Sequence, residues 1–561
     1  MDSIICHLED NVHKHNAVWR FPAENIECQL SDINAISIHY ANILKKHNIK
    51  RGDRIGLILD NSKDYVCLLL AIWRLNAIAI PLRPKGGKQV CYEQYIRYCN
   101  EICEFNLIIY NNQNNEGKLN DIDLDLQTEV LPLHYFQESS RDVYNSIRFA
   151  NENISEDDIA ILQFSSGSTG DPKGVIVTHG MMMRQLQNIL YNHIGSRRGK
   201  PIESLASWMP INHDMGLFIG VLAPVYTGCV HLLAPPSFYM RNPSRWFKFL
   251  SEYKVDMTFT TNSVLATTLR MLCRLHGNKA IDLSTLHLYI GAEKVSPIIV
   301  RKCYEILAPL NLKKEHVHIG YGMAENALGA ACTRSNIITM NYFQFIGAEK
   351  LEKAVGENSH AIELVSLGTP DLHHEITIRN QQDNILPDLT LGEINIQSPC
   401  VTPGYYNNET ITQQKILNGR LRTGDLGFYY QGELYYYSRI DDLIISGGRN
   451  IVPDDVESVV EELSFVRPTA SCLISVDNND TGLDQISLFV ELKDNLSEEA
   501  LNDYRIKIQS YVYETLDIYL QKILFCVKGT VEKTSSGKKR RKVVRQRFTE
   551  GNISLLERKN G

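Results

Sequence analysis

The sequence predicts an α/β protein: a large N-terminal domain of mostly parallel sheets with a β-rich subdomain, followed by a small α+β C-terminal domain. Three observations support this prediction. Short, continuous apolar runs alternate with helical patterns as far as about residue 370, as in parallel sheets buried on both faces. Beyond that point apolar and polar residues alternate singly. The chain has 561 residues, which is too long for one hydrophobic core.

The N-terminal part repeats the strand–helix pattern several times. Residues 54–82 read as strand, helix, strand, and the strands at 158–166 and 256–261 are each followed by a helical pattern. Polar or glycine-bearing loops follow predicted strands at Ser165–Gly174, Asn212–Gly216, Gly291–Lys294 and Gly320–Glu325. Because ligands bind at the carboxyl ends of strands in such sheets, we expect these loops to share one crevice.

The loop Ser165–Gly174, SSGSTGDPKG, predicts a polyphosphate site. Its small residues allow backbone N–H groups to converge on an anion, and Lys173 adds a positive charge. A surface turn would explain Asp171-Pro172 but not the run of hydroxyl and glycine residues before it. In a Walker A loop the lysine directly follows a glycine, whereas two residues separate Gly170 from Lys173 here. A kinase or motor ATPase is therefore disfavoured.

The C-terminal part begins near residues 439–442. Before it, segments such as HEITIRN and GELYYYSR alternate like half-buried antiparallel strands. After it, we expect a strand, a helix from Pro453, two strands, a helix and a last strand. Pro453 followed by two aspartates suits a helix start, since proline fits the first turn and acids interact favourably with its positive end.

The composition indicates a soluble cytoplasmic protein without nucleic acid or stable membrane insertion. The formal net charge is −7, so no overall attraction to anionic polymers is expected. The longest apolar run, Val66–Trp73, is far too short to cross a bilayer, and the N-terminus lacks the apolar core of a signal peptide. The 13 cysteines are scattered, which favours reduced structural thiols.

Five motifs resemble those of the adenylate-forming superfamily, which includes acyl-CoA synthetases, nonribosomal peptide adenylation domains and firefly luciferase. Besides SSGSTGDPKG they are YGMAENAL (321–328), LRTGDLG (421–427), SRIDDLIISGGRNIVPDDVE (438–457) and VEKTSSGKKRR (531–541). They stand in the family's order along most of the chain. The resemblance implies a domain over 1–438, a hinge over 439–442 with Asp441 at its pivot, and a mobile domain over 443–561.

The resemblance also implies where ATP would bind. The implied nucleotide-binding residues are Ser165, Ser166, Gly167, Ser168, Thr169, Gly170, Lys173, Gly291, Ala292, Glu293, Tyr321, Gly322, Met323, Ala324, Asp425 and Arg439. Residues 165–173 would hold the β- and γ-phosphates, and Asp425 would accept both ribose hydroxyls. Tyr321 would stack on adenine or, alternatively, serve as a core tyrosine. Arg439 would reach the ribose or a phosphate.

Three further residues are expected to serve the chemistry. Glu325 would bind Mg²⁺, which prefers hard oxygen ligands and bridges phosphates. Lys538 would neutralise the charge that develops when a carboxylate attacks the α-phosphate, and a swing of the small domain would bring it in and out. His213 would lie near the acyl carboxylate as a gate, although a packed structural histidine is an open alternative. The acyl chain would lie among apolar side chains of residues 208–230 and 259–269.

Several features resemble the fatty acyl-AMP ligase branch, which passes the acyl group to an acyl carrier protein. They include His213-Asp-Met-Gly, Ala324 where coenzyme A ligases usually have threonine, and an insertion at about 333–370. The residues alone leave open whether the insertion is an ordered strand pair or a surface loop. In that branch it restrains the small domain and disfavours coenzyme A. One departure is Glu532, where the family usually has proline.

The resemblance implies a fatty acid substrate, ATP and Mg²⁺, and a carrier protein supplied as a separate chain. The basic residues of 539–547 would face that acidic carrier or simply be solvated. Two alternatives stay open: a fatty acyl-CoA or aryl-CoA ligase, and a non-catalytic adenylate-binding scaffold.

Overall fold

The structure is a computed structural model. It describes residues 3–14, 17–84, 89–111, 128–138, 154–165, 172–196, 199–272, 281–333, 337–346, 349–354, 361–446, 449–477, 484–493, 497–533 and 539–556.

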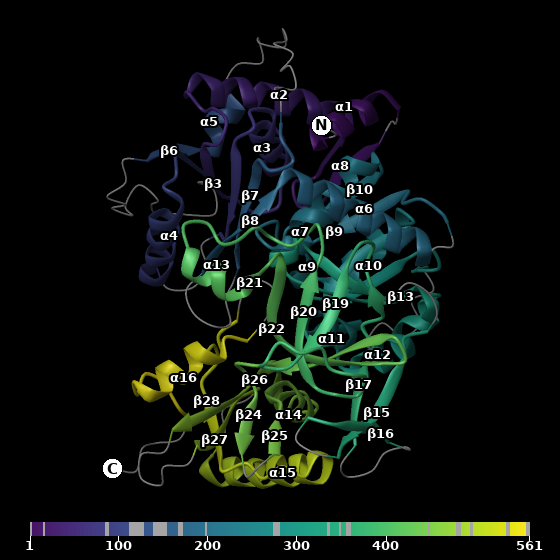
Figure 1. The fold of residues 1–561 in the computed structure, drawn as a ribbon, viewed down its shortest axis with the longest axis vertical. Helices are drawn as coiled ribbons and strands as arrows, with labels where there is room; N and C mark the ends of the chain where they lie inside the picture. The colour runs from purple at the N-terminus through teal and green to yellow at the C-terminus, as the bar shows by residue number, and fades with distance from the viewer. Residues whose placement is uncertain are drawn as a thin grey trace.

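Two large, mostly parallel sheets form the N-terminal part (Figure 1). Within the described ranges, one has the strand order β18-β14-β13-β12-β11-β9-β10-β1-β2 and the other β6-β5-β3-β4-β7-β8. The first contains β1 (Val18–Phe21), β2 (Ile26–Gln29), β9 (Ser204–Ser207), β10 (Val230–Leu233), β11 (Met257–Thr261), β12 (His287–Gly291), β13 (Val317–Gly322), β14 (Gly329–Cys332) and β18 (Thr369–Pro370). The second contains β3 (Arg54–Ile58), β4 (Ile78–Leu82), β5 (Leu107–Tyr110), β6 (Glu129–Pro132), β7 (Ile159–Ser165) and β8 (Lys173–Thr178). Antiparallel pairs occur only toward the sheet edges among these strands, so the predicted α/β architecture is confirmed.

Helices pack on both sheets. They are α1 (Ile4–Lys14), α2 (Leu30–Lys46), α3 (Lys63–Arg74), α4 (Gln89–Cys103), α5 (Leu133–Glu138), α6 (His179–Ser196), α7 (Asp214–Leu217), α8 (Ala223–Thr227), α9 (Pro236–Arg241), α10 (Pro243–Glu252), α11 (Asn262–Leu272) and α12 (Pro297–Leu307). The apolar run 66–73 lies in α3, whose side chains are buried on every face from Asp64 onward. Trp73 joins α3 to β7, because its indole N–H donates to the carbonyl of Ala160 over 3.0 Å.

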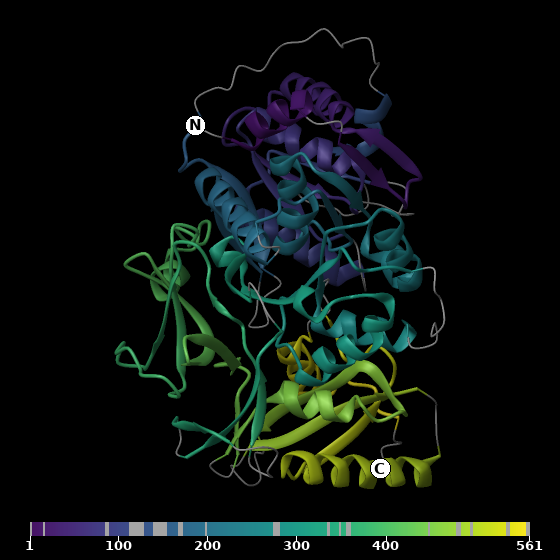
Figure 2. The ribbon, with the colours of Figure 1, turned by 90° about the vertical axis from the view of Figure 1, so that its right-hand side faces the viewer.

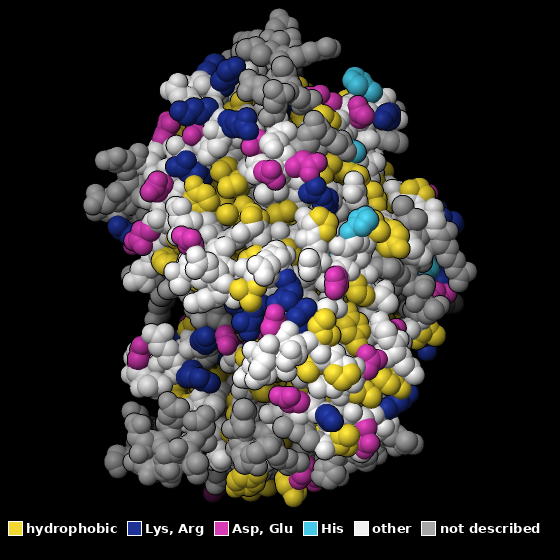
Figure 3. Space-filling view, in the orientation of Figure 1, with side chains coloured by type: hydrophobic (Ala, Val, Ile, Leu, Met, Phe, Trp, Pro, Cys, Tyr) yellow, Lys and Arg dark blue, Asp and Glu magenta, His cyan; other side chains and the backbone are white. Residues whose placement is uncertain are grey.

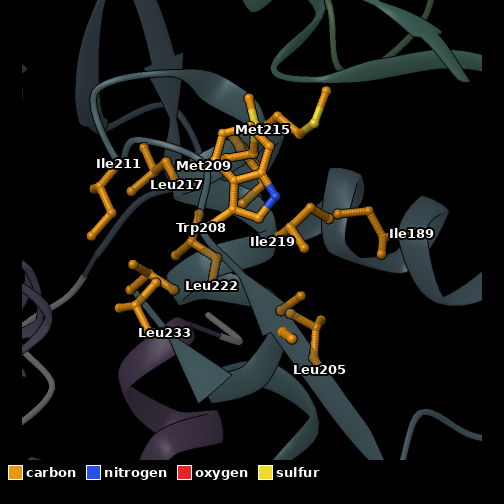
Figure 4. Packing of buried hydrophobic residues seen from close by; sticks show 14 of the residues in the cluster. Ile189, Leu205, Trp208, Met209, Ile211, Met215, Leu217, Ile219, Leu222 and Leu233 are labelled. Atoms are coloured by element: carbon orange, nitrogen blue, oxygen red, sulfur yellow. The ribbon is translucent and has the colours of Figure 1, made fainter. Parts of the chain in front are cut away.

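The hydrophobic core includes residues on both sides of α7 in the sequence. Trp208, Leu217 and Leu222 are almost completely buried, and Figure 4 shows them packed with Leu205 and Leu233 of the neighbouring strands. Burial of each such side chain stabilises the fold by about 1.5–3 kcal/mol. In the part of the chain that the structure describes, no helix has the length and hydropathy needed to cross a bilayer.

A β-rich unit lies beside the first sheet and is antiparallel, as predicted. It contains β19 (Glu375–Arg379), β20 (Gly392–Gln397), β21 (Ile416–Leu417), β22 (Arg420–Tyr430) and β23 (Glu433–Arg439), and α13 (Glu409–Lys415) precedes β21. Figure 2 shows this unit standing out to one side of the body.

The insertion at about 333–370 is an ordered sheet and not a surface loop. Strands β15 (Met340–Phe345), β16 (Leu351–Lys353) and β17 (Ile362–Val365) pair antiparallel in the order β16-β15-β17. Phe343 is fully buried, with its ring centroid 4.9 Å from that of Phe428 and 5.1 Å from that of Tyr435. These aromatic contacts hold the insertion on β22 and β23.

The residues after 443 have a hydrophobic cluster of their own, which runs from Ile444 to Phe525. Their elements are β24 (Ile444–Ser446), β25 (Arg449–Ile451), α14 (Pro453–Val460), β26 (Val466–Asp477), β27 (Asp484–Leu492), α15 (Glu498–Leu516), β28 (Lys522–Cys526) and α16 (Arg541–Thr549). Polar contacts join this part to the body: Lys294 Nζ lies 2.6 Å from Asp455 Oδ1, and Arg270 donates to the carbonyl of Glu461.

Replacing Phe343 with alanine is expected to lower the free energy of unfolding by about 3–5 kcal/mol, because a fully buried ring leaves a cavity. Urea unfolding of the two proteins measures the difference. Ile346→Ala is the matched control, since that side chain is 58% exposed and its loss should change the free energy by less than about 0.5 kcal/mol. Equal losses in both variants would contradict the packing of this sheet.

Candidate active site

One cavity of about 880 Å³ lies where the carboxyl ends of the first sheet face the β-rich unit. Residues from all four predicted loops line it. The predicted site residues on its wall are Lys173, His213, Gly291, Ala292, Glu293, Tyr321, Gly322, Met323, Ala324, Glu325, Asp425, Arg439 and Asp441. Ser166, Gly167, Ser168, Thr169, Gly170 and Lys538 lie outside the described residues, as does the side chain of Ser165 at the end of β7.

The carboxylate of Asp425 is held by two elements at once. Tyr321 Oη donates to Asp425 Oδ2 over 2.8 Å, and Arg439 Nε lies 3.3 Å from Asp425 Oδ1. Asp425 and Arg439 are direct cross-strand partners on β22 and β23, so the sheet register brings this ion pair together. The result is a nearly buried carboxylate on the cavity wall, positioned to accept further hydrogen bonds from hydroxyl groups.

The protonation states of this group follow from burial and charge. Burial raises the pKa of the Tyr321 hydroxyl well above its ordinary value, and the charge of Asp425 raises it further. Burial lowers the pKa of the Arg439 guanidinium, but the neighbouring Asp425 carboxylate outweighs that effect and the net pKa is raised. Tyr321 is therefore a neutral donor and Arg439 a permanent cation.

Glu325 and Lys173 face the cavity from different elements. Glu325 lies in a short 3₁₀ turn after β13, where Tyr405 Oη donates to its Oε1 over 2.9 Å. Lys173 begins β8, and its Nζ lies 5.7 Å from the centre of the Tyr405 ring. Burial lowers the pKa of Lys173, while the Glu325 carboxylate opposes that shift. The wall thus offers a carboxylate oxygen and an ammonium group close together.

Two glycines of the predicted motifs are required by close backbone approaches. A Cβ on Gly322 would stand 1.8 Å from the carbonyl oxygen of Leu328, and one on Gly291 would stand 2.9 Å from that of Gly320. Any side chain at Gly322 would push apart the turn that carries Glu325.

His213 and Glu293 both cap helices beside the cavity. Nδ1 of His213 lies 3.2 Å from the backbone N of Met215 at the start of α7 and 2.5 Å from Asp214 Oδ1. Glu293 accepts hydrogen bonds from the backbone N–H and the hydroxyl of Ser263, at the start of α11. These two side chains therefore have structural partners in addition to their places on the cavity wall.

Comparison with known proteins identifies the family. Residues 15–406 match the description AMP-binding enzyme. The chain belongs to the AMP-binding enzyme family. It is 30% identical over 422 residues to the long-chain-fatty-acid–AMP ligase FadD26 of Mycobacterium marinum, covering 71% of each chain. The Mycobacterium tuberculosis protein of the same name is 28% identical over 421 residues, again with 71% of each chain covered.

Solved structures agree in fold. A structure from studies of the fatty acyl-adenylate ligases of E. coli and L. pneumophila superposes with a TM-score of 0.86 at 24% identity, covering 98% of both chains. The AMP-binding fold thus extends beyond the matched family region into the C-terminal part.

The apolar part of the cavity wall differs from the predicted acyl pocket of this AMP-binding enzyme. Phe259 and Ala266 line the cavity, and the Phe259 ring stacks on Tyr289 at 4.8 Å. Among the apolar side chains of residues 208–230, however, Met215 alone belongs to the described wall of the cavity. Trp208 instead packs in the core against Tyr239, with ring centroids 4.3 Å apart.

Sequence reasoning missed Glu393 of β20, which positions the loop that carries Asp425. Its Oε1 accepts from the backbone N–H of Gly424 over 3.0 Å, and its Oε2 accepts from Arg422 over 2.8 Å. In the alternating segment GEINIQ this glutamate reads as a solvent-facing residue, whereas the structure buries it. The available signal was an acidic residue on the strand that pairs with the LRTGDLG motif.

The prediction that the basic residues of 539–547 face solvent or a carrier protein is wrong for Lys539 and Arg541. Lys539 Nζ lies 2.8 Å from Glu457 Oε2, and Arg541 Nη2 lies 2.7 Å from the same oxygen. The lysine and arginine side chains are 14% and 12% exposed. Both cations therefore neutralise a fully buried carboxylate inside the C-terminal part.

Glu532, which stands where the family usually has proline, forms an ion pair with Arg547 at 2.6 Å.

Asp425→Asn is expected to weaken AMP binding by about 10- to 100-fold, because hydrogen bonds to a charged acceptor contribute about 1.5–3 kcal/mol. Isothermal titration calorimetry of the folded variant measures this. Asp388→Asn, at an exposed position of the β-rich unit, should bind AMP like the unchanged protein. Equal affinities in all three proteins would remove Asp425 from nucleotide binding.

Proposed function

We propose that this AMP-binding enzyme is a fatty acyl-AMP ligase, which joins a fatty acid to ATP as an acyl-adenylate with release of pyrophosphate. The observation that carries the proposal is the single cavity that combines Lys173, Glu325 and the Asp425–Arg439 pair with an apolar wall at Phe259. The relatives named long-chain-fatty-acid–AMP ligases support the choice of substrate.

The first step is attack of the fatty acid carboxylate on the α-phosphorus of ATP. A bond forms between a carboxylate oxygen and that phosphorus, and the bond from phosphorus to the bridging oxygen of the β-phosphate breaks. Two anions approach each other, so fixed positive charge is required in a water-poor site. Lys173 and Arg439 supply such charge on the described wall, Asp425 holds the ribose, and the proposed Lys538 completes the set.

Glu325 is the proposed protein ligand for Mg²⁺. Its carboxylate lines the cavity, and the hydroxyl of Tyr405 orients one of its oxygens. Among the described residues there is no cluster of three or more acidic, histidine or cysteine side chains that would hold a metal ion. Phosphate and water oxygens would therefore complete the coordination, as Mg²⁺ commonly requires. Bound there, the ion would draw charge from the phosphate oxygens.

The second proposed step transfers the acyl group to the phosphopantetheine thiol of a separate acyl carrier protein. The thiol sulfur bonds to the acyl carbonyl carbon and gives its proton to solvent, and AMP leaves as the bond between that carbon and the phosphate oxygen breaks. The part beyond the Asp441 hinge would rotate between the two steps. The insertion shares a hydrophobic cluster with Val452, which lies beyond that hinge, and this packing favours a restricted rotation and hence a carrier protein over free coenzyme A.

The acceptor decides between this function and its alternatives. Labelled fatty acids of several chain lengths are incubated with ATP and Mg²⁺, and then with coenzyme A or a phosphopantetheinylated acyl carrier protein. We expect fatty-acid-dependent ATP–pyrophosphate exchange and loading of the carrier only. Rapid acyl-CoA formation without carrier loading would indicate a coenzyme A ligase. A lack of exchange with every acid would indicate a non-catalytic scaffold.

Lys538→Ala is expected to reduce exchange activity by about 100- to 1,000-fold, because a transition-state charge loses its counter-ion. Affinity for ATP, measured by calorimetry, should change by less than about threefold. Lys528→Ala, an exposed lysine of the same part, is the control and should keep full activity. Unchanged exchange in Lys538→Ala would exclude this residue from the chemistry.

A further inference from the structure

Lys415, the last residue of α13, places its ammonium group at the loop that carries Asp425. A Cβ on Gly424 would stand 3.1 Å from Lys415 Nζ and 3.7 Å from Arg439 Nη2, so the two cations are close neighbours. Gly424 has a φ of +76°, which favours glycine, and the missing side chain leaves room for both. Lys415 also lines the cavity.

Lys415 has no hydrogen bond or ion pair to any other residue that the structure describes. The nearby carboxylates have other partners: Asp425 is held by Tyr321 and Arg439, and Glu325 by Tyr405. Burial lowers the pKa of Lys173, and the positive charge of Lys415 lowers it further. Lys173, Lys415 and Arg439 therefore form a cluster of three cations around one part of the cavity.

Carboxylates offset part of this positive charge, since Asp425 pairs with Arg439 and the charge of Glu325 raises the pKa of Lys173, but Lys415 has no ion pair among the described residues. Like charges repel strongly where water is partly excluded, and a long lysine side chain can ordinarily swing into solvent. Lys415 is instead half-buried, and its ammonium lies over the Gly424 backbone beside a second cation. In Figure 3, Lys and Arg side chains gather near the middle of the face between α13 and β26. Such an arrangement fits a ligand with several negative charges.

We propose that Lys415 binds the phosphate chain of ATP that leaves as pyrophosphate. The inference rests on the proposed function for the identity of the nucleotide. The chain's negative charge would lie between Lys173 and Lys415, while Asp425 and Arg439 hold the ribose side. Lys415 then contacts the leaving phosphates directly and contributes little to the binding of AMP.

Direct binding without a fatty acid tests this role independently of the acyl substrate. The probes are α,β-methylene ATP with Mg²⁺, and AMP, measured by calorimetry on the full chain. Lys415→Gln should weaken binding of the triphosphate by about 10- to 100-fold, as for loss of one charge-assisted hydrogen bond. Binding of AMP should change by less than about twofold. Lys415→Arg should keep at least a tenth of the triphosphate affinity.

Lys528→Gln controls for the loss of one positive charge elsewhere on the surface and should bind both probes normally. Equal affinity of Lys415→Gln and the unchanged protein for the triphosphate would overturn the proposal. Equal weakening for AMP and the triphosphate would also overturn it, because Lys415 would then support the loop or the ribose side. If Lys415→Gln behaves as expected but no acid supports exchange, the fatty acyl-AMP ligase function fails and the phosphate role of Lys415 stands.

Discussion

The ion pair between Asp425 and Arg439 is the contact on which the rest of the site depends. It lies across β22 and β23, and Tyr321 of β13 donates to the same carboxylate. One carboxylate therefore connects β13 of the first sheet to β22 and β23 of the β-rich unit. Burial strengthens each of these contacts, since an unpaired charge in this position would be costly. The carboxylate proposed to accept the ribose hydroxyls is therefore held in place by Tyr321 and Arg439.

A second buried carboxylate, Glu457, organises the C-terminal part. It is fully buried, and Lys539 and Arg541 both pair with it. These pairs fix Lys539 and Arg541 on α14. The same basic run would be read as a solvated tail if only its charge were considered. Its real function in the fold is to neutralise an acid on α14.

The cavity combines a fixed wall with polar contacts that can separate. The parallel strands of the first sheet end at one edge, which explains why residues far apart in sequence line a common space. In contrast, the C-terminal part meets the body through contacts such as Lys294–Asp455 and Lys302–Glu462. The Lys302 and Glu462 side chains are 44% and 26% exposed, and a pair with that exposure contributes little to stability. Such a contact is compatible with the proposed rotation of the C-terminal part.

The sequence by itself determined the element types, the fold class and the family motifs, because periodicity and turn chemistry are local properties. The helix from Pro453 and the alternating strands before residue 439 are examples. Tertiary structure alone decided burial and partners. Glu393 was missed and Trp208 was expected at the acyl pocket because burial depends on which segment lies alongside, and Lys415 was overlooked because its approach to Gly424 depends on how α13 meets β22. Local patterns carry no information on such contacts between distant segments.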